Sequence, residues 1–87
     1  MKNRSATPYY FRSSDGYELD LVLDWGAELW AIEIKLTSNP SKQEIDRLNK
    51  VADMIGATQR ILLCRIEEPF GNDTLTVTQP KKWLEQL

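Results

Sequence analysis

Histidine is absent from the sequence, and cysteine occurs only once, as Cys64, among 87 residues. Without imidazole the chain cannot build a Ser-His-Asp triad, a Cys-His pair or most kinds of zinc site. A single thiol cannot form an intrachain disulfide, and its place in the apolar run at 61–64 predicts a buried structural cysteine. Any catalysis by this chain must therefore depend on carboxylates and lysine.

Long apolar runs are also absent. No stretch approaches the roughly 20 apolar residues needed to span a bilayer, and the N-terminus lacks the apolar segment of a signal peptide. We therefore expect a cytoplasmic protein with no membrane partner. A formal net charge of −2 provides no large basic field, so contact with nucleic acid must be local or completed by other parts of a larger assembly.

A hydrophobic fraction of 41% and a charged fraction of 28% predict one globular domain over residues 1–87. We expect residues 1–8 to form a loosely ordered lead-in and residues 9–87 to form the core. The chain length leaves no room for a second domain.

Three strands and two turns are predicted in the first half of the core. Aromatic residues favour a strand at 9–12, and the Asp-Gly pair at 15–16 is a hairpin signal that leads to a strand at 17–24. A turn at 25–28 then leads to a strand at 29–36. In the second strand, alternation predicts that four apolar side chains share one face: Tyr17, Leu19, Leu21 and Leu23.

A helix with an apolar period near 3.6 is predicted to follow and to end at Gly56. Ser41 and Glu44 have the spacing of a capping box, although Asn39 as the N-cap with Pro40 at the first helical position is equally compatible. The remaining elements are expected to be a strand at 60–66 that completes a β-α-β crossover, a loop at 70–73, an edge strand at 74–78 and a helix at 80–87. That last helix should turn Trp83, Leu84 and Leu87 inward.

Most aromatic and basic side chains are expected to have structural roles. The predicted core includes four aromatic residues in strands: Tyr9, Tyr10, Phe11 and Trp30. Trp25, in the turn, is the aromatic residue expected to be exposed. The basic residues of the helix, Lys42, Arg47 and Lys50, are mixed with acidic ones, which predicts a solvated face.

Acidic residues and one lysine lie on the strands of the predicted hairpin. A four-residue loop at 25–28 places Asp20 opposite Glu33 and Glu18 opposite Lys35. Directly opposed side chains have Cβ atoms roughly 5 Å apart, and like charges opposed in this way destabilise a sheet. The opposition of Asp20 and Glu33 therefore suggests a compensating ion or a compensating function.

Two carboxylates at that distance can bind one divalent cation, Mg²⁺ or Mn²⁺, through oxygen ligands. Lys35 lies two residues beyond Glu33 on the same face, where its ammonium could stabilise charge on a phosphate. These groups meet the requirement of metal-assisted phosphodiester hydrolysis. The alternative is a solvated surface on which Lys35 pairs with Glu18 for well under about 1 kcal/mol.

Two segments carry a resemblance to a known family: residues 10–23, YFRSSDGYELDLVL, and residues 30–35, WAIEIK. They resemble the core of the PD-(D/E)XK superfamily, with an aromatic-R-x-x-D-G-x-E-hydrophobic-D strand followed by A-I-E-[VI]-K. The closest resemblance is to the C-terminal domain of undefined function found in bacterial and archaeal AAA+ ATPases. It spans about residues 9 to 65.

The resemblance implies an α+β, restriction-endonuclease-like fold with a mixed β-sheet, a hairpin, a crossover helix and a short C-terminal helix. It assigns Asp20 and Glu33 as the motif carboxylates and Lys35 as the motif lysine, with Glu18 as a further acidic position. Superfamily nucleases usually supply another acidic residue from a helix before the first core strand. Residues 1–14 contain no Asp or Glu, so we expect the missing group to belong to a longer protein or the site to be incomplete.

Three functions remain open at this point. The first is a nuclease-like domain that holds Mg²⁺ or Mn²⁺ at Asp20 and Glu33. The second is an inactive module that contacts DNA or docks on an ATPase module or another partner chain. The third is a protein-interaction domain whose acidic hairpin is surface. The sequence leaves the oligomeric state, the type of nucleic acid and any sequence preference undetermined.

Overall fold

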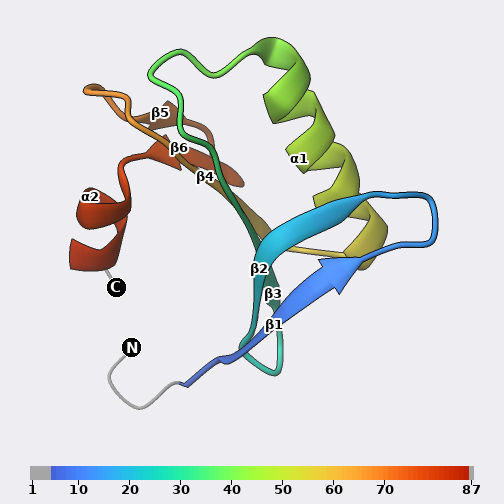
Figure 1. Ribbon diagram of the computed structural model, residues 1–87. Helices are drawn as coiled ribbons and strands as arrows, with labels where there is room; N and C mark the ends of the chain where they lie inside the picture. Colours follow the sequence, from blue (N-terminus) through green and yellow to red (C-terminus); the bar gives the residue numbers. More distant parts are fainter. Residues whose placement is uncertain (1–4, 87) are drawn as a thin grey trace.

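The computed structural model describes residues 5–86 and shows a six-stranded mixed sheet with one helix on each side (Figure 1). The strand order is β1-β2-β3-β4-β6-β5. Helix α1 (Lys42–Ile55) covers one side, here the α1 side, and the short helix α2 (Pro80–Glu85) lies on the other, the α2 side. The predicted α+β class, with its hairpin, crossover helix and short C-terminal helix, is confirmed.

An antiparallel meander of three strands forms half of the sheet: β1 (Thr7–Arg12), β2 (Glu18–Asp24) and β3 (Leu29–Ile34). Strand β1 begins two residues before the predicted strand, and the part of the expected lead-in at 1–4 lies outside the described residues. The turn between β1 and β2 depends on Gly16, whose φ of 89° favours glycine. Asp24 pairs with Leu29, so the register predicted from the four-residue loop is confirmed.

A β-bulge interrupts the pairing of β1 with β2. Tyr9 pairs with Val22 and Phe11 with Leu19, so two steps along β1 match three steps along β2. The extra residue reverses the alternation within β2. Leu19 and Val22 both pack in the core on the α1 side, whereas Leu21 packs against the core on the α2 side. The prediction that the alternate leucines of this strand share one face is therefore wrong.

Helix α1 begins and ends at the residues that its sequence signals indicate. The Ser41 side chain accepts from the backbone N–H of Glu44, and the Glu44 side chain accepts from the backbone N–H of Ser41. This is the predicted capping box, so the alternative with Asn39 as the N-cap is not the one formed. Gly56 closes the helix in the left-handed conformation, at φ 74°.

Parallel pairing continues the sheet beyond β3. Strand β4 (Gln59–Leu63) is parallel to β3 and completes the predicted β-α-β crossover, and β6 (Leu75–Thr78) is parallel to β4. Strand β5 (Phe70–Gly71) pairs antiparallel with β6. The strand predicted at 74–78 is present as β6, but it is not at the edge of the sheet, because β5 covers its outer side. The prediction of a loop over all of 70–73 is wrong for the same reason, since β5 occupies its first two residues.

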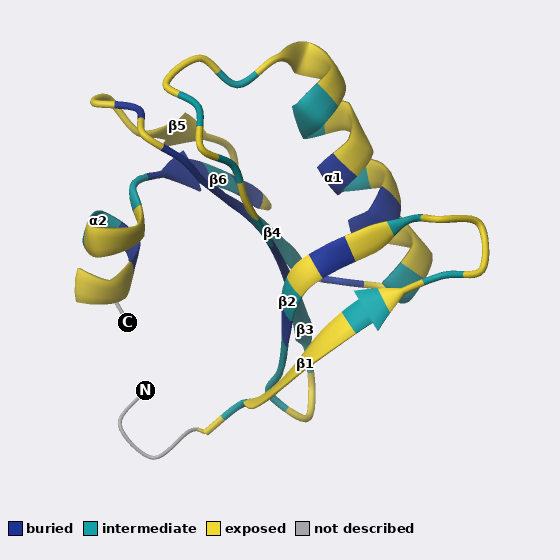
Figure 2. Ribbon diagram, in the orientation of Figure 1, coloured by how far each residue is buried: buried dark blue, intermediate teal, exposed yellow. Residues whose placement is uncertain are grey.

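Two apolar cores lie on the two sides of the sheet. Figure 2 shows buried segments in the central strands and in both helices. The core on the α1 side contains Cys64, which is buried as predicted. The core on the α2 side joins Ile32 and Ile61 to Trp83 of α2. Leu84, predicted to point inward, is exposed, because the short helix turns only Trp83 toward the sheet. Leu87 lies outside the described residues.

The aromatic residues of β1 do not all enter the core. Tyr9 and Tyr10 are exposed, since β1 is an edge strand, whereas Phe11 packs against the core on the α1 side. Trp25 is half-buried and not exposed as predicted, with its ring centroid 5.0 Å from that of Trp30. Within residues 5–86 no helix is long and apolar enough to cross a membrane.

Candidate functional site

Asp20 lies at the bulge of β2 and joins this strand to the end of β3. Its Oδ2 accepts a hydrogen bond of 2.8 Å from the backbone N–H of Ile34. Regular pairing of the two strands ends one step earlier, at Leu21 and Ile32. The Asp20 carboxylate therefore binds a backbone donor just beyond the point where the ladder stops.

Glu33 stands next to Asp20 on the neighbouring strand. Alternation along β3 places it on the α1 side with Ala31, and its side chain is only 15% exposed. Burial raises the pKa of Glu33 to about 7, and the Asp20 carboxylate adds to the rise by accepting a hydrogen bond and by repulsion. Lys35 and a backbone hydrogen bond from Asp20 lower that pKa in part. Near neutral pH the Glu33 carboxyl is thus divided between its protonated and ionised forms.

Lys35 completes the group. Its Nζ lies 3.9 Å from Oε2 of Glu33, and its side chain is 40% exposed. Its backbone N–H donates to the carbonyl oxygen of Leu63 at 2.9 Å, which extends the pairing of β3 with β4 by one step. The lysine is therefore held by its backbone beside the two carboxylates, with an ammonium that solvent and a ligand can reach.

Glu18 has a different neighbour. Its carboxylate accepts a hydrogen bond from the hydroxyl of Tyr10, and this bond raises the pKa of Tyr10. The predicted alternative partner of Glu18 was Lys35, which instead lies beside Glu33. Glu18 is also paired with Arg12 across β1 and β2, one residue before Leu19, which faces the α1 side. The bond to Tyr10 thus holds Glu18 against the edge strand β1.

The structure brings together three of the four predicted site residues: Asp20, Glu33 and Lys35. Across the described part of the chain, no three His, Cys, Asp or Glu side chains gather closely enough to hold a metal ion. Two carboxylates nevertheless fit Mg²⁺, which usually binds one or two carboxylates and takes its other ligands from water and substrate phosphates. Burial does most to raise the pKa of Glu33, and a bound cation would relieve the part of the rise that comes from repulsion by Asp20.

Two contacts around this region have no signal in the sequence. The hydrogen bond of Asp20 to a backbone N–H depends on where the bulge falls, which alternation alone does not reveal. Arg60, on β4, is largely buried against α1, where it bonds Asp53 at 2.9 Å and the carbonyl oxygen of Ala57 at 3.0 Å. Its guanidinium is therefore held at the C-terminal end of the helix by these bonds.

Comparison with known families gives one match. The sequence model of a family described as a domain of unknown function, DUF4143, matches residues 1–83. No curated protein and no solved structure matches the chain. The family match covers nearly the whole chain, and the chain therefore belongs to the DUF4143 family.

Proposed function

We propose that this member of the DUF4143 family is a PD-(D/E)XK nuclease-like domain that contacts nucleic acid through Asp20, Glu33 and Lys35, with Mg²⁺ or Mn²⁺ as its cofactor. One observation carries the proposal. A carboxyl with a pKa raised to about 7 lies beside a second carboxylate, with a lysine ammonium 3.9 Å away. Perturbed carboxyl groups with a specific charged neighbour are typical of functional sites.

The order of the elements supports the same assignment. The resemblance places the first carboxylate on one strand and the Glu-x-Lys pair on a second strand, followed by a helix and a further strand. Here Asp20 is on β2, and Glu33 is on β3, with Lys35 just beyond its end. Helix α1 and the parallel strand β4 follow.

Each side chain has a role that follows from its position. Asp20 and Glu33 would supply the protein oxygen ligands of the cation, which would polarise a phosphate and activate water. Lys35, with 40% of its side chain exposed, can place positive charge against a phosphate oxygen as negative charge develops there. Without the cation, Glu33 holds a proton part of the time near neutral pH, because its pKa is about 7, and binding of the cation would displace that proton.

Nucleases of this superfamily usually have a further acidic residue at the metal site, and here the described residues bring together only two carboxylates. We expect the remaining ligand to come from another part of a longer protein or from a partner chain such as an ATPase module. The isolated chain should therefore cut DNA or RNA weakly at most. Cleavage that requires Lys35 and appears only when the partner is added would fit this arrangement.

Paramagnetic Mn²⁺ tests the metal site directly. Added to the labelled protein, it should broaden the NMR signals of residues 18–20 and 33–35 first, and Asp20→Asn with Glu33→Gln should abolish this effect. The exposed pair Glu67 and Glu68 provides an internal control, since it is acidic but lies outside the site. Broadening centred on that pair, with none at the hairpin, would rule out the proposed site.

A second candidate is an inactive docking or DNA-contacting module. One observation favours it. Asp20 accepts a hydrogen bond from the backbone N–H of Ile34, which is a structural role. In that case Mn²⁺ has no effect at the hairpin and no metal supports cleavage of single- or double-stranded DNA or RNA. A protein-interaction domain with an acidic surface hairpin would behave in the same way and would in addition bind no nucleic acid.

A further inference from the structure

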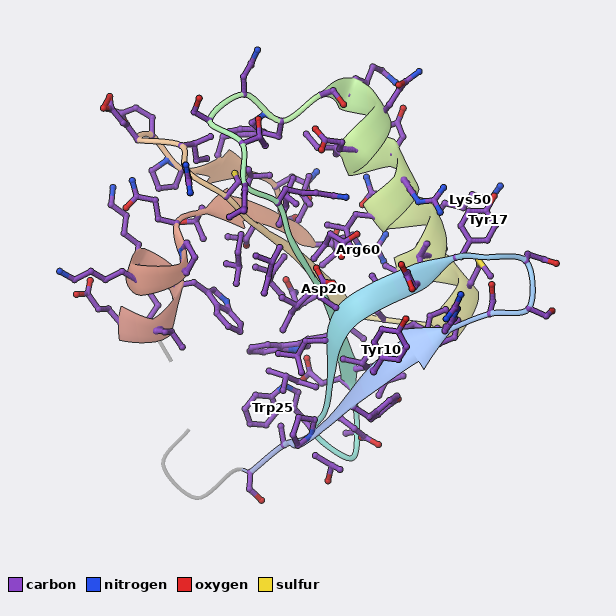
Figure 3. All side chains as sticks on the ribbon, in the orientation of Figure 1. Tyr10, Tyr17, Asp20, Trp25, Lys50 and Arg60 are labelled. Carbon is purple, nitrogen blue, oxygen red and sulfur yellow. The ribbon has the colours of Figure 1, made fainter. Side chains whose placement is uncertain are left out.

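Two basic side chains of α1 lie over the ring of Tyr17, at the end of the hairpin that carries Asp20. The guanidinium carbon of Arg47 is 4.8 Å from the ring centroid, and the Nζ of Lys50 is 4.9 Å from it. Arg47 also donates a hydrogen bond of 3.4 Å to the carbonyl oxygen of Gly16. Figure 3 shows Lys50 beside Tyr17, where the turn after β1 meets the helix.

The acidic residues of α1 do not neutralise this pair. Each of them has a partner elsewhere, so the mixed, solvated face predicted from the sequence is divided into separate contacts. Within residues 5–86, Arg47 and Lys50 form no ion pair with a carboxylate. The partners of the helix acids are the N–H of Ser41 for Glu44, Lys42 for Asp46 and Arg60 for Asp53.

Two cations that each lie about 5 Å from the same ring centroid are no more than about 10 Å apart. They repel one another, and the aromatic ring offsets only part of this repulsion. A ligand with several negatively charged oxygens, such as a run of backbone phosphates, would bind both and reduce the repulsion. The pair thus has the chemistry of an anion-binding site whose anion is not supplied by residues 5–86.

The position of the pair indicates which phosphate compound it would bind. Tyr17 precedes Asp20 by three residues on the extended chain, which is about 10 Å. Both the basic pair and Glu33 belong to the α1 side of the sheet, because Arg47 and Lys50 are on α1 itself. A nucleic-acid strand covers about 10 Å within roughly three nucleotides. One strand can therefore contact both places.

We propose that Arg47 and Lys50, held over Tyr17, bind backbone phosphates of a nucleic-acid strand and lead that strand to Asp20 and Glu33. The choice of nucleic acid as the ligand rests on the proposed function of the carboxylate pair. The binding itself requires no metal and no cleavage. It gives a protein of negative net charge a local place to hold a polyanion.

The test measures binding of single-stranded DNA and RNA oligonucleotides to the whole chain in chelator by fluorescence anisotropy, over a series of salt concentrations. The double variant Arg47→Gln with Lys50→Gln should bind about tenfold or more weakly, and its logarithmic salt dependence should fall by about 0.7 for each lost contact. The matched control is Arg65→Gln with Lys81→Gln, which removes one arginine and one lysine from exposed positions. That control should lose little affinity.

Variants of the ring separate the site from general charge effects. Tyr17→Phe keeps the aromatic face and should bind as the parent does, whereas Tyr17→Leu should weaken binding. Thermal melting of every variant checks that it is folded. Failure of the parent to bind at low salt, or equal losses in the two double variants, would overturn the proposal.

The outcomes also distinguish this proposal from the metal site. Because binding is measured in chelator, absence of Mn²⁺ broadening at the hairpin would contradict the proposed function and leave the phosphate site standing. Broadening at residues 18–20 and 33–35, with no effect of the Arg47 and Lys50 substitutions on binding, would contradict the phosphate site and leave the metal site standing.

Discussion

Replacing Glu33 with glutamine should stabilise the protein above neutral pH and have little effect in acid. Glutamine resembles the protonated side chain and carries no charge to be repelled by Asp20. In the parent, the buried Glu33 must ionise beside that carboxylate as the pH rises, and its pKa is raised from 4.5 to about 7. The variant avoids this step.

The sign and size follow from that pKa. A carboxyl that binds its proton more tightly in the folded than in the unfolded state contributes stability that is fully present below about pH 4.5. This stability is lost as the pH rises through about 7. The full loss corresponds to at most about 3 kcal/mol in the free energy of unfolding. The variant should gain up to this amount over the parent at pH 8, and little of it at pH 4.5.

Urea denaturation of both proteins between pH 4.5 and pH 8.5 gives the difference directly. Glu68→Gln removes the same charge from an exposed position and controls for the change in net charge. Free energies of unfolding that run parallel for parent and Glu33→Gln over this range would refute the burial and repulsion described here. So would a variant that is less stable than the parent at pH 8.

Further substitutions at three positions probe the site and the helix. Asp20→Ala removes the acceptor of the Ile34 N–H and should cost about 1 to 2 kcal/mol at pH 5 by urea denaturation, whereas Asp20→Asn keeps an acceptor and should cost less. Lys35→Met removes the cation that lowers the pKa of Glu33, so NMR titration should place that pKa higher than in the parent. Ser41→Ala breaks the capping box and should cost about 1 kcal/mol, and no change in the urea midpoint would contradict the cap.

The parts of the fold that could be predicted are those with local signals. The turn at 25–28 fixed the hairpin register, because a loop of known length leaves one pairing that keeps Asp24 opposite Leu29. The capping box and Gly56 fixed the helix, since both act on neighbouring backbone groups. The same register predicted that Asp20 and Glu33 lie close together, although the regular pairing ends one step earlier, at Leu21 and Ile32.

The bulge could not be predicted, because it depends on how β1 matches β2 and leaves no mark on composition. Alternation read along β2 alone assigns its leucines to one face, whereas the extra residue divides them between two cores. The partners of the acidic residues of α1 could not be predicted either. Arg60 comes from another element to bind Asp53, and only the folded chain shows that Arg47 and Lys50 have no carboxylate partner among residues 5–86.

The short strand β5 shows a different limit. Its two residues are too few to form a periodic pattern, and Phe70 and Gly71 belong to a segment with the composition of a loop. Only the structure shows why glycine stands there: a Cβ at Gly71 would overlap the carbonyl group of Leu75. The close approach of the two backbones is set by tertiary pairing and has no signal in the local sequence.

The bulge in β2 also bears on how the domain opens. Since one strand contributes Leu19 and Val22 to the core under α1 and Leu21 to the core under α2, neither core can separate from the sheet without disturbing the same backbone. The two layers should therefore behave as one cooperative unit in native-state hydrogen exchange, with amides of β2, β3 and β4 sharing one opening free energy. Loosening of α2 should then also lower the protection of amides at the opposite surface, where the hairpin meets α1.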